Sequence, residues 1–244
     1  MTNCWEDRLL TRPIVMGHRG ARAEAPENTL MAFERALNIG ADMVELDLRE
    51  TEDGHLVCLH DPDVSRTTNG TGLVSQLTLD EIRSLDAGES QRVPLLEEAL
   101  DFARGRIGVN IDVKVHGAEE RILEYVEKRG MIGTVMVSAF HHVILEITRE
   151  LSPHIATALI FKKNMEDYIR HATEIDANAV NPEYEILTLE AVRSAQEVGL
   201  AVYPWTVNEK PSLLRMLEMG VNGIITDDPR VAMQVISDYL DSKR

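Results

Sequence analysis

A regular alternation of short apolar segments with amphipathic segments is the feature that most constrains how this chain folds. The apolar segments have the length and composition of buried strands, and the amphipathic ones repeat their apolar residues at helical spacing. Parallel strands joined by helical crossovers produce this order, and eight such units predict an α/β fold, the closed (β/α)8 or TIM barrel, as one domain over residues 1–244. The predicted strands are residues 13–16, 42–48, 107–113, 134–137, 154–161, 177–180, 200–203 and 223–225.

Residues typical of helix ends support the predicted helices. Asn28 or Thr29 is the expected N-cap of the helix after the first strand, and Gly40 stands at the expected C-terminal end of that helix. Asp228, followed by Pro229, has the same N-cap position before the last helix. The other predicted helices are residues 95–103, 118–128, 141–151, 164–174, 188–198 and 211–219.

One connection breaks the alternation, between the second strand and the second helix. Residues 49–94 form a loop far longer than the usual 2 to 6 residues between a strand and the next helix. This loop contains a short strand at 56–60, a turn at 67–72 and a helix at 78–85. We expect a small insertion at about 50–94 that shapes the barrel mouth and carries His60; the alternative is an inert decoration.

Charge and cysteine content limit the partners and the compartment. The net charge of -16 argues against nucleic acid and against stable association with an anionic membrane. Cys4 and Cys58 are too few for a disulfide framework and fit a reducing cytoplasm. The first twelve residues lack the apolar core of a signal peptide, and no apolar run approaches the ~18 residues of a membrane span. We therefore expect a cytoplasmic protein.

Glu45 and Asp47 are two residues apart on the second predicted strand. Side chains at this spacing point to the same face of a strand, with α-carbons about 6.6 to 6.8 Å apart. Two carboxylates held together repel each other unless a cation lies between them, and Mg2+ or Ca2+ prefers such oxygen ligands. The alternative is an ion-pair cluster in which Arg19 or Lys114 neutralises both carboxylates.

Polar residues gather at the carboxyl ends of the predicted strands, which is where the active sites of (β/α)8 barrels lie. Strand ends are often polar for other reasons as well, and the pattern favours an active site at this end of the barrel. The residues in question are His18, Arg19, Glu45, Asp47, Asp112, Lys114, Ser138, Trp205 and Asp227.

Six short motifs in a fixed order resemble the glycerophosphodiester phosphodiesterases. They are HRG at 18–20, PENT at 26–29, GADMVELDL at 40–48, TEDGHLVCLHD at 51–61, WTVN at 205–208 and TDDP at 226–229. The resemblance extends over about residues 14–231. It implies a metal-dependent hydrolase that converts a glycerophosphodiester, such as glycerophosphocholine or glycerophosphoethanolamine, to sn-glycerol 3-phosphate and an alcohol.

The chemistry of a phosphodiester assigns roles to the charged residues of these motifs. The substrate is an anion whose cleavage needs charge neutralisation at phosphorus and protonation of the departing alkoxide. Arg19 and Lys114 can supply positive charge to the substrate. His18 and His60 are the candidates for proton transfer, one as base and the other as acid. We expect no special role for the remaining histidines, which are His55, His116, His141, His142, His154 and His171.

The third metal ligand is implied by the resemblance. The family usually has a Glu two residues before the lysine of the third strand, and here Asp112 precedes Lys114. Asp112 is shorter by one methylene, so the ion lies closer to this strand or a water bridges the gap; the alternative is a simple salt bridge between Asp112 and Lys114. The expected ion is Mg2+ or Ca2+, with Mn2+ as a further candidate.

Trp205 is the remaining substrate-binding candidate. Its indole can pack against the glycerol or the leaving alcohol, although a tryptophan beside a proline also serves as a hydrophobic plug. Weaker candidates at the strand ends are Ser138, Phe161, Asn181 and Asn208.

Two other functions stay open at this level. One is cleavage of lysophospholipids at the head group, and the other is a barrel that binds a phosphorylated metabolite without turning it over. The residues also leave open whether water attacks phosphorus directly or the glycerol 2-hydroxyl attacks first. Homo-oligomerisation is equally undecided.

Overall fold

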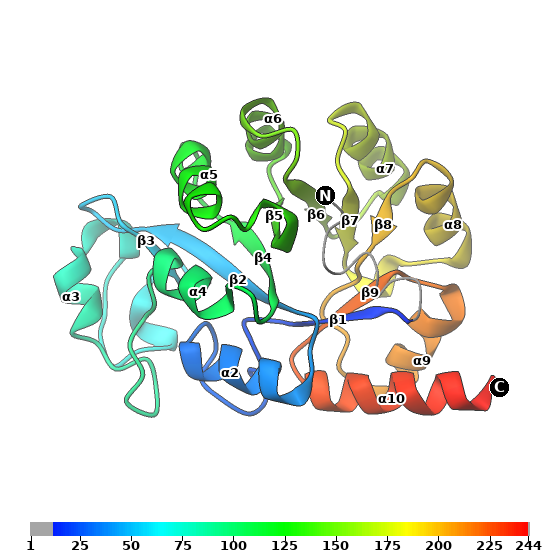
Figure 1. Ribbon diagram of the computed structural model, residues 1–244, viewed down its shortest axis with the longest axis horizontal. Helices are drawn as coiled ribbons and strands as arrows, with labels where there is room; N and C mark the ends of the chain where they lie inside the picture. Colours follow the sequence, from blue (N-terminus) through cyan, green and yellow to red (C-terminus); the bar gives the residue numbers. More distant parts are fainter. Residues whose placement is uncertain (1–11, 244) are drawn as a thin grey trace.

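Eight parallel strands lie side by side in the centre of the molecule, with helices around them (Figure 1). The computed structural model describes residues 12–243. Within these residues the strands follow the order β8-β7-β6-β5-β4-β2-β1-β9, and every neighbouring pair is parallel. The barrel strands are β1 (Ile14–Gly17), β2 (Met43–Glu50), β4 (Gly108–Val113), β5 (Val135–Ala139), β6 (Ala156–Phe161), β7 (Ala179–Pro182), β8 (Ala201–Val202) and β9 (Gly223–Thr226).

The two end strands, β8 and β9, are joined by single backbone hydrogen bonds. Asn222 N donates to Val202 O at 3.1 Å, and Ile225 N donates to Pro204 O at 3.0 Å. Val207 N in turn donates to Ile225 O at 3.0 Å. These bonds bring the sheet nearly full circle, and the predicted (β/α)8 fold is confirmed.

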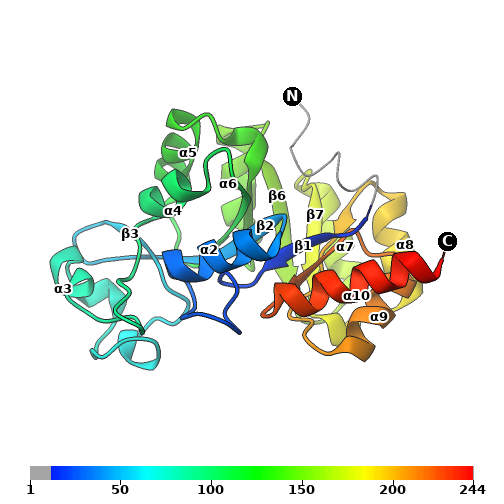
Figure 2. The same ribbon diagram turned by 60° about the horizontal axis from the view of Figure 1, so that its bottom comes forward.

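A helix follows each barrel strand and covers the outside of the barrel. Figures 1 and 2 show α2 and α10 side by side over β1, on the opposite side of the barrel from α5 to α7. The helices are α2 (Leu30–Ile39), α4 (Leu96–Ala103), α5 (Glu119–Lys128), α6 (His142–Leu151), α7 (Met165–Glu174), α8 (Leu189–Glu197), α9 (Lys210–Met219) and α10 (Pro229–Ser242).

The helix-end predictions are resolved by the side-chain contacts. Thr29, and not Asn28, is the N-cap of α2, because its Oγ1 accepts a hydrogen bond from Ala32 N at 3.2 Å. Gly40 ends α2 with a left-handed φ of 95°. Asp228 caps α10 by accepting from Val231 N at 3.1 Å. Asn28 is left free to contact the barrel interior.

The strand alternation divides the core into two layers. Outward side chains such as Val44 and Leu46 pack against the helices in one large apolar cluster. Inward side chains such as Met16, Met43 and Tyr203 form a second cluster inside the barrel. This second cluster fills the barrel interior toward the amino ends of the strands. The polar side chains that follow it along the same strands lie at the carboxyl-terminal mouth.

The insertion after β2 forms a small unit with its own apolar cluster. It begins with β3 (Leu56–Cys58), which pairs antiparallel with the end of β2, and it continues through η1 (Val64–Arg66), η2 (Val74–Gln76) and α3 (Leu79–Arg83). In Figure 1 it lies to the left, beside the carboxyl end of β2. Leu59 N donates to Asp47 O at 3.0 Å. This bond positions His60, the next residue, at the mouth.

One predicted strand boundary is wrong, and one weak site candidate lies away from the cavity. The strand expected at 177–180 is β7, which begins two residues later, because Ala177 N donates to Ala172 O at 2.8 Å and completes the turn after α7. Phe161, a weak site candidate, faces the outer layer and stacks on Tyr168 with ring centroids 4.4 Å apart. It therefore does not contribute to the mouth.

Cys58 is buried with a free thiol, and Cys4 lies outside the described residues. Among the helices of residues 12–243, none combines the length and apolar character needed to cross a bilayer.

Candidate active site

A cavity of about 300 Å³ opens at the carboxyl ends of the barrel strands. It gathers residues from all eight barrel strands or the loops that follow them, and from the insertion. All eight residues predicted as catalytic, substrate-binding or metal-ligating line this one cavity: His18, Arg19, Glu45, Asp47, His60, Asp112, Lys114 and Trp205.

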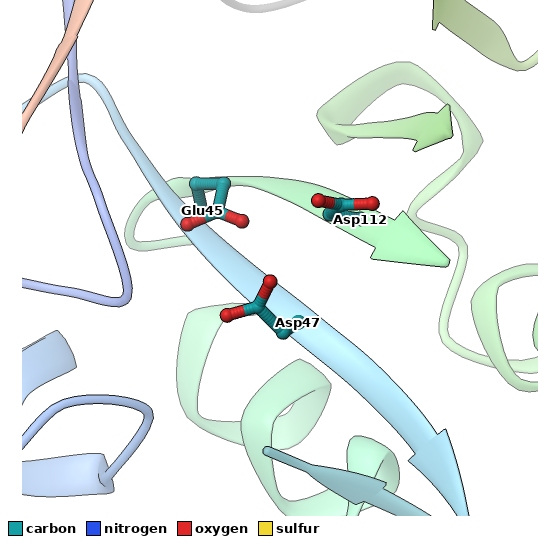
Figure 3. Close-up of side chains that lie close together, drawn as sticks. All are labelled: Glu45, Asp47 and Asp112. Atoms are coloured by element: carbon teal, nitrogen blue, oxygen red, sulfur yellow. The ribbon is translucent and has the colours of Figure 1, made fainter. Parts of the chain in front are cut away.

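Three carboxylates from two neighbouring strands meet at the floor of the cavity. Asp47 on β2 lies opposite Asp112 on β4 in the parallel ladder, and Glu45 precedes Asp47 on the same face of β2. Figure 3 shows the three carboxylates converging from the two strands. One oxygen from each lies within 4.8 Å of the others, and all three side chains are buried. This geometry matches a site for a single cation with oxygen ligands.

Two cations partly neutralise this triad. Arg19 Nε lies 3.0 Å from Asp47 Oδ2, and Lys114 Nζ lies 3.1 Å from Asp47 Oδ1 and donates to Asp112 Oδ2. Among residues 12–243, the one hydrogen bond that Glu45 accepts is from Arg19 N, at 2.8 Å. The ion-pair cluster weighed from the sequence is therefore present, but two cations face three carboxylates and one negative charge is left over.

The pKa values of the triad reflect this imbalance. Burial and the charges of Asp47 and Asp112 raise the pKa of Glu45 well above its ordinary value. Burial also raises the pKa of Asp112 to about 6, although Lys114 opposes the increase. Burial acts in the same direction on Asp47, but Lys114 and Arg19 outweigh it and lower the pKa of that carboxyl. A bound cation would relieve the repulsion that raises the first two values.

The GHRG and PENT segments hold Arg19 and Asp47 in place. Arg19 has a left-handed φ of 57°, which turns its N–H toward Glu45. The next residue is a glycine, Gly20, because a Cβ at that position would lie 2.5 Å from the carbonyl carbon of Ala32 in α2. Asn28 Nδ2 donates to Asp47 Oδ2 at 2.9 Å, and Asp47 N donates to Asn28 Oδ1 at 3.2 Å. The motif asparagine thus orients a carboxylate of the triad.

His18 lies at the end of β1 with a carboxylate behind it. Its Nδ1 is 2.6 Å from Asp227 Oδ1, and Asp227 also accepts from Asn208 Nδ2 at 2.9 Å. Burial lowers the pKa of His18, against the opposing effect of the Asp227 hydrogen bond. A carboxylate at Nδ1 fixes that nitrogen as the protonated one and leaves Nε2 as the nitrogen for chemistry.

His60 has the same arrangement on the insertion. Its Nδ1 is 2.5 Å from Asp61 Oδ1, and Arg66 Nε lies 2.5 Å from Asp61 Oδ2. Arg66 also donates to Glu27 at 2.7 Å, and Glu27 accepts from Arg19 at 2.7 Å. Burial lowers the pKa of His60, although Asp47 and Asp61 oppose this. The insertion is therefore tied to the barrel through charged groups that end at the site.

The outer part of the cavity is aromatic. Trp205 lies edge-on to Phe140 with ring centroids 5.8 Å apart, and its Nε1 donates to Asn181 O at 2.8 Å. Lys162 Nζ lies 5.3 Å from the centre of the Trp205 ring. Trp205 is only half-buried, which leaves its ring available to a ligand.

Sequence reasoning missed six lining residues, which are Asn110, Phe140, Ile160, Lys162, Thr206 and Ile225. The alternation that singled out Asp112 also places Asn110 on the inner face of β4, so that residue could have been found. Phe140 and Lys162 follow β5 and β6 without a motif to mark them. Of the weaker candidates, Ser138 and Asn181 line the cavity, and Asn208 contacts Asp227 instead.

A parallel barrel whose mouth combines buried carboxylates, two cations and two carboxylate-backed imidazoles defines an enzyme equipped for acid–base cleavage of an anionic ester. Comparison with known sequences makes this specific. Residues 18–231 match the model of the glycerophosphoryl diester phosphodiesterase family, and the chain belongs to that family. The family expected from the motifs is thereby confirmed, and with it the class of reaction, hydrolysis of glycerophosphodiesters.

Individual relatives agree with this assignment over more than nine tenths of the chain. A glycerophosphodiester phosphodiesterase of Caldanaerobacter subterraneus is 35% identical over 92% of this chain and 98% of its own. One of Bacillus altitudinis is 35% identical over 91% and 97%. An Oleispira antarctica phosphodiesterase, solved in complex with the product sn-glycerol-3-phosphate, is 26% identical with a TM-score of 0.85 over 93% and 97% of the two chains.

Proposed function

We propose that this chain uses a divalent metal ion to hydrolyse glycerophosphodiesters to sn-glycerol 3-phosphate and an alcohol. The observation that carries the proposal is the meeting of His18, His60 and the carboxylate triad in one cavity. The product named in the Oleispira structure supports the choice of substrate.

The triad fits a divalent ion. Its donors are all carboxylate oxygens, the set preferred by Mg2+, Ca2+ and Mn2+. Asp112 Oδ1 is buried without a hydrogen-bond partner in the part of the chain that the structure describes, which is costly unless a ligand satisfies it. Glu45, Asp47 and Asp112 would hold the ion, and Asp112 would serve in place of the usual glutamate. A bound divalent ion supplies Lewis-acid neutralisation of a phosphoryl oxygen.

Arg19 and Lys114 have a double role in this proposal. In the structure they neutralise Asp47 and Asp112, and they also line the cavity. Once the carboxylates are compensated by an ion, both positive charges become available to the phosphodiester anion. Their burial strengthens this attraction, because charges removed from water are screened less.

His18 and His60 move the protons. Their lowered pKa values favour the neutral imidazole near pH 7, and in each residue a carboxylate holds Nδ1. The histidine that acts as base is neutral and accepts the proton of the attacking hydroxyl at Nε2. The histidine that acts as acid reacts as the imidazolium and gives its Nε2 proton to the departing alkoxide oxygen. Trp205 offers its ring to the carbon skeleton of the substrate.

The test is a product assay for sn-glycerol 3-phosphate with and without chelator, repeated on His18→Ala and on His154→Ala as an exposed histidine control. We expect chelation and His18→Ala each to remove at least about 99% of the activity, since general acid–base catalysis contributes about 100-fold or more. Activity that survives both treatments would refute the proposed active site.

Faster turnover of lysophosphatidylcholine than of any glycerophosphodiester would favour the alternative function, head-group cleavage of lysophospholipids. A substrate without the glycerol 2-hydroxyl separates direct water attack from a cyclic intermediate. Cytoplasmic location and homo-oligomerisation stay predictions.

A further inference from the structure

The mouth of the cavity is an aromatic corner that already holds positive charge. Phe140 and Trp205 meet edge to face, and both are partly exposed. Lys162 Nζ lies 5.3 Å from the Trp205 ring centre, and Lys114 Nζ lies 5.5 Å from the Phe140 ring centre. Aromatic faces are the usual binding place for a quaternary ammonium group. Here each ring already has an ammonium group of the protein near it.

Lys162 has no acidic partner among residues 12–243. No carboxylate oxygen lies within 4.0 Å of its Nζ, and its only described contact is with Trp205. It is exposed, and it lines the cavity through the loop that follows β6. Its charge is therefore not neutralised locally and acts on whatever occupies the mouth.

The net charge of the residues that line the cavity is positive once the carboxylate triad holds a divalent ion. Glu45, Asp47 and Asp112 are the acidic lining residues within the described part of the chain, and a divalent ion would leave them with one net negative charge. The lysines and arginine of the lining are Arg19, Lys114 and Lys162. The balance is about two positive charges, and one phosphodiester anion leaves about one. A cationic alcohol would add to this excess, whereas an uncharged or anionic alcohol would not.

The interior of the cavity suits the glycerol end of the substrate. Asn110 and Asn181 are 1% exposed, line the cavity, and have no hydrogen-bond partner for either amide atom within residues 12–243. Buried amides of this kind require partners, and glycerol hydroxyls can both donate and accept. The glycerol portion, common to all these substrates, then occupies the interior and the variable alcohol lies at the mouth.

We propose that Lys162, beside Trp205 and Phe140, makes this enzyme select glycerophosphodiesters whose leaving alcohol is uncharged or anionic, such as glycerol or inositol, over those that release choline or ethanolamine. This inference rests on the proposed function and specifies its substrate class. Lys162 acts as a specificity-determining residue through its charge and takes no part in proton transfer.

The experiment compares kcat/KM for glycerophosphoglycerol and glycerophosphocholine in wild type, Lys162→Met and Lys162→Glu. Two unit charges about 7 Å apart at an effective dielectric constant of about 40 change an equilibrium about 7-fold, before screening by salt. We expect wild type to favour glycerophosphoglycerol. Lys162→Met should shift the ratio toward glycerophosphocholine about 3-fold or more, and Lys162→Glu about 10-fold or more.

Lys163→Glu is the matched control, because Lys163 is the next residue, is exposed, and does not line the cavity. It should change the ratio less than about 2-fold. A wild-type preference for glycerophosphocholine, an unchanged ratio in Lys162→Glu, or an equal shift in Lys163→Glu would overturn the inference.

A binding measurement separates this inference from the proposed function. In a His18→Ala background the intact substrates can be titrated by calorimetry, and Lys162→Glu should tighten glycerophosphocholine relative to glycerophosphoglycerol by a similar factor. If wild type hydrolyses neither substrate, the proposed function fails and this binding ratio alone decides the role of Lys162. If hydrolysis occurs but neither ratio responds to residue 162, only the inference fails.

Discussion

Replacing Asp227 by Asn tests whether the carboxylate behind His18 controls proton transfer. Asp227 Oδ1 lies 2.6 Å from His18 Nδ1, with side-chain exposures of 21% and 13%. The carboxylate orients the imidazole, fixes its tautomer and stabilises the imidazolium that forms when a proton is accepted. A hydrogen bond to a charged group contributes about 2–3 kcal/mol, so loss of the charge should lower kcat about 30- to 150-fold with little change in KM.

The pH dependence of kcat/KM is an independent test of the same Asp227→Asn substitution. Burial lowers the pKa of His18, and the hydrogen bond and charge of Asp227 oppose that effect. Asp227→Asn removes the opposing charge, so the pKa of His18 should fall further. If His18 is the base, the acidic limb of the kcat/KM profile moves to lower pH; if it is the acid, the alkaline limb moves to lower pH.

The assay is release of sn-glycerol 3-phosphate from glycerophosphoglycerol, with kcat and KM determined separately. Asp228→Asn is the matched control, because Asp228 is the next residue and its N-cap bond to Val231 N can be made equally well by asparagine. The control should retain full activity, and thermal unfolding should show both variants folded. An Asp227→Asn enzyme that keeps more than about a third of kcat, or a control that loses as much, would refute the reasoning.

Divalent ions should stabilise the fold through the triad: Mg2+ or Ca2+ at 100 times its Kd adds about 2.7 kcal/mol, or about 5–10 °C in Tm, and Asp112→Asn should remove most of this shift. An equal shift in the variant would place the ion elsewhere. Asn181→Leu removes a buried amide without a partner, so Tm should hold or rise while KM increases about 10-fold; a fall of Tm with unchanged KM would contradict this. Burial raises the pKa of Glu27, but Arg66 and Arg19 outweigh it and lower the pKa to about 2. Because this lies below the ordinary 4.5, Glu27 stabilises the fold above about pH 4.5 and loses that effect as pH falls toward 2. Denaturant unfolding should therefore show the difference between wild type and Glu27→Gln shrinking by about 1–2 kcal/mol from pH 7 to pH 3, and a constant difference would disprove it.

The predicted fold was recovered because its signal is local and repeated. Strand and helix periodicities recur along the whole chain, and the caps at Thr29 and Asp228 mark helix starts directly. Boundaries failed where a tertiary contact outweighed the local pattern, as at Ala177, which completes the turn after α7. The expected residues at the mouth could be identified because the carboxyl ends of parallel strands converge at one end of a barrel.

The contacts between these residues could not be predicted in the same way. His18 and Asp227 are 209 residues apart in sequence, and no local sequence pattern indicates that their side chains meet. The link from His60 through Arg66 to Glu27 likewise depends on how the insertion packs beside β2.

The sequence by itself determined the barrel, the family and the pair of carboxylates on β2, because each depends on spacing along a single element or on motifs in order. Only the tertiary structure decided that three carboxylates meet two cations, that the imidazoles of His18 and His60 each have a carboxylate at Nδ1, and that Lys162 faces the mouth without an acidic partner among the described residues. The physical reason is that charge balance and burial are sums over groups brought together from distant parts of the chain, and those sums exist only after the barrel has closed.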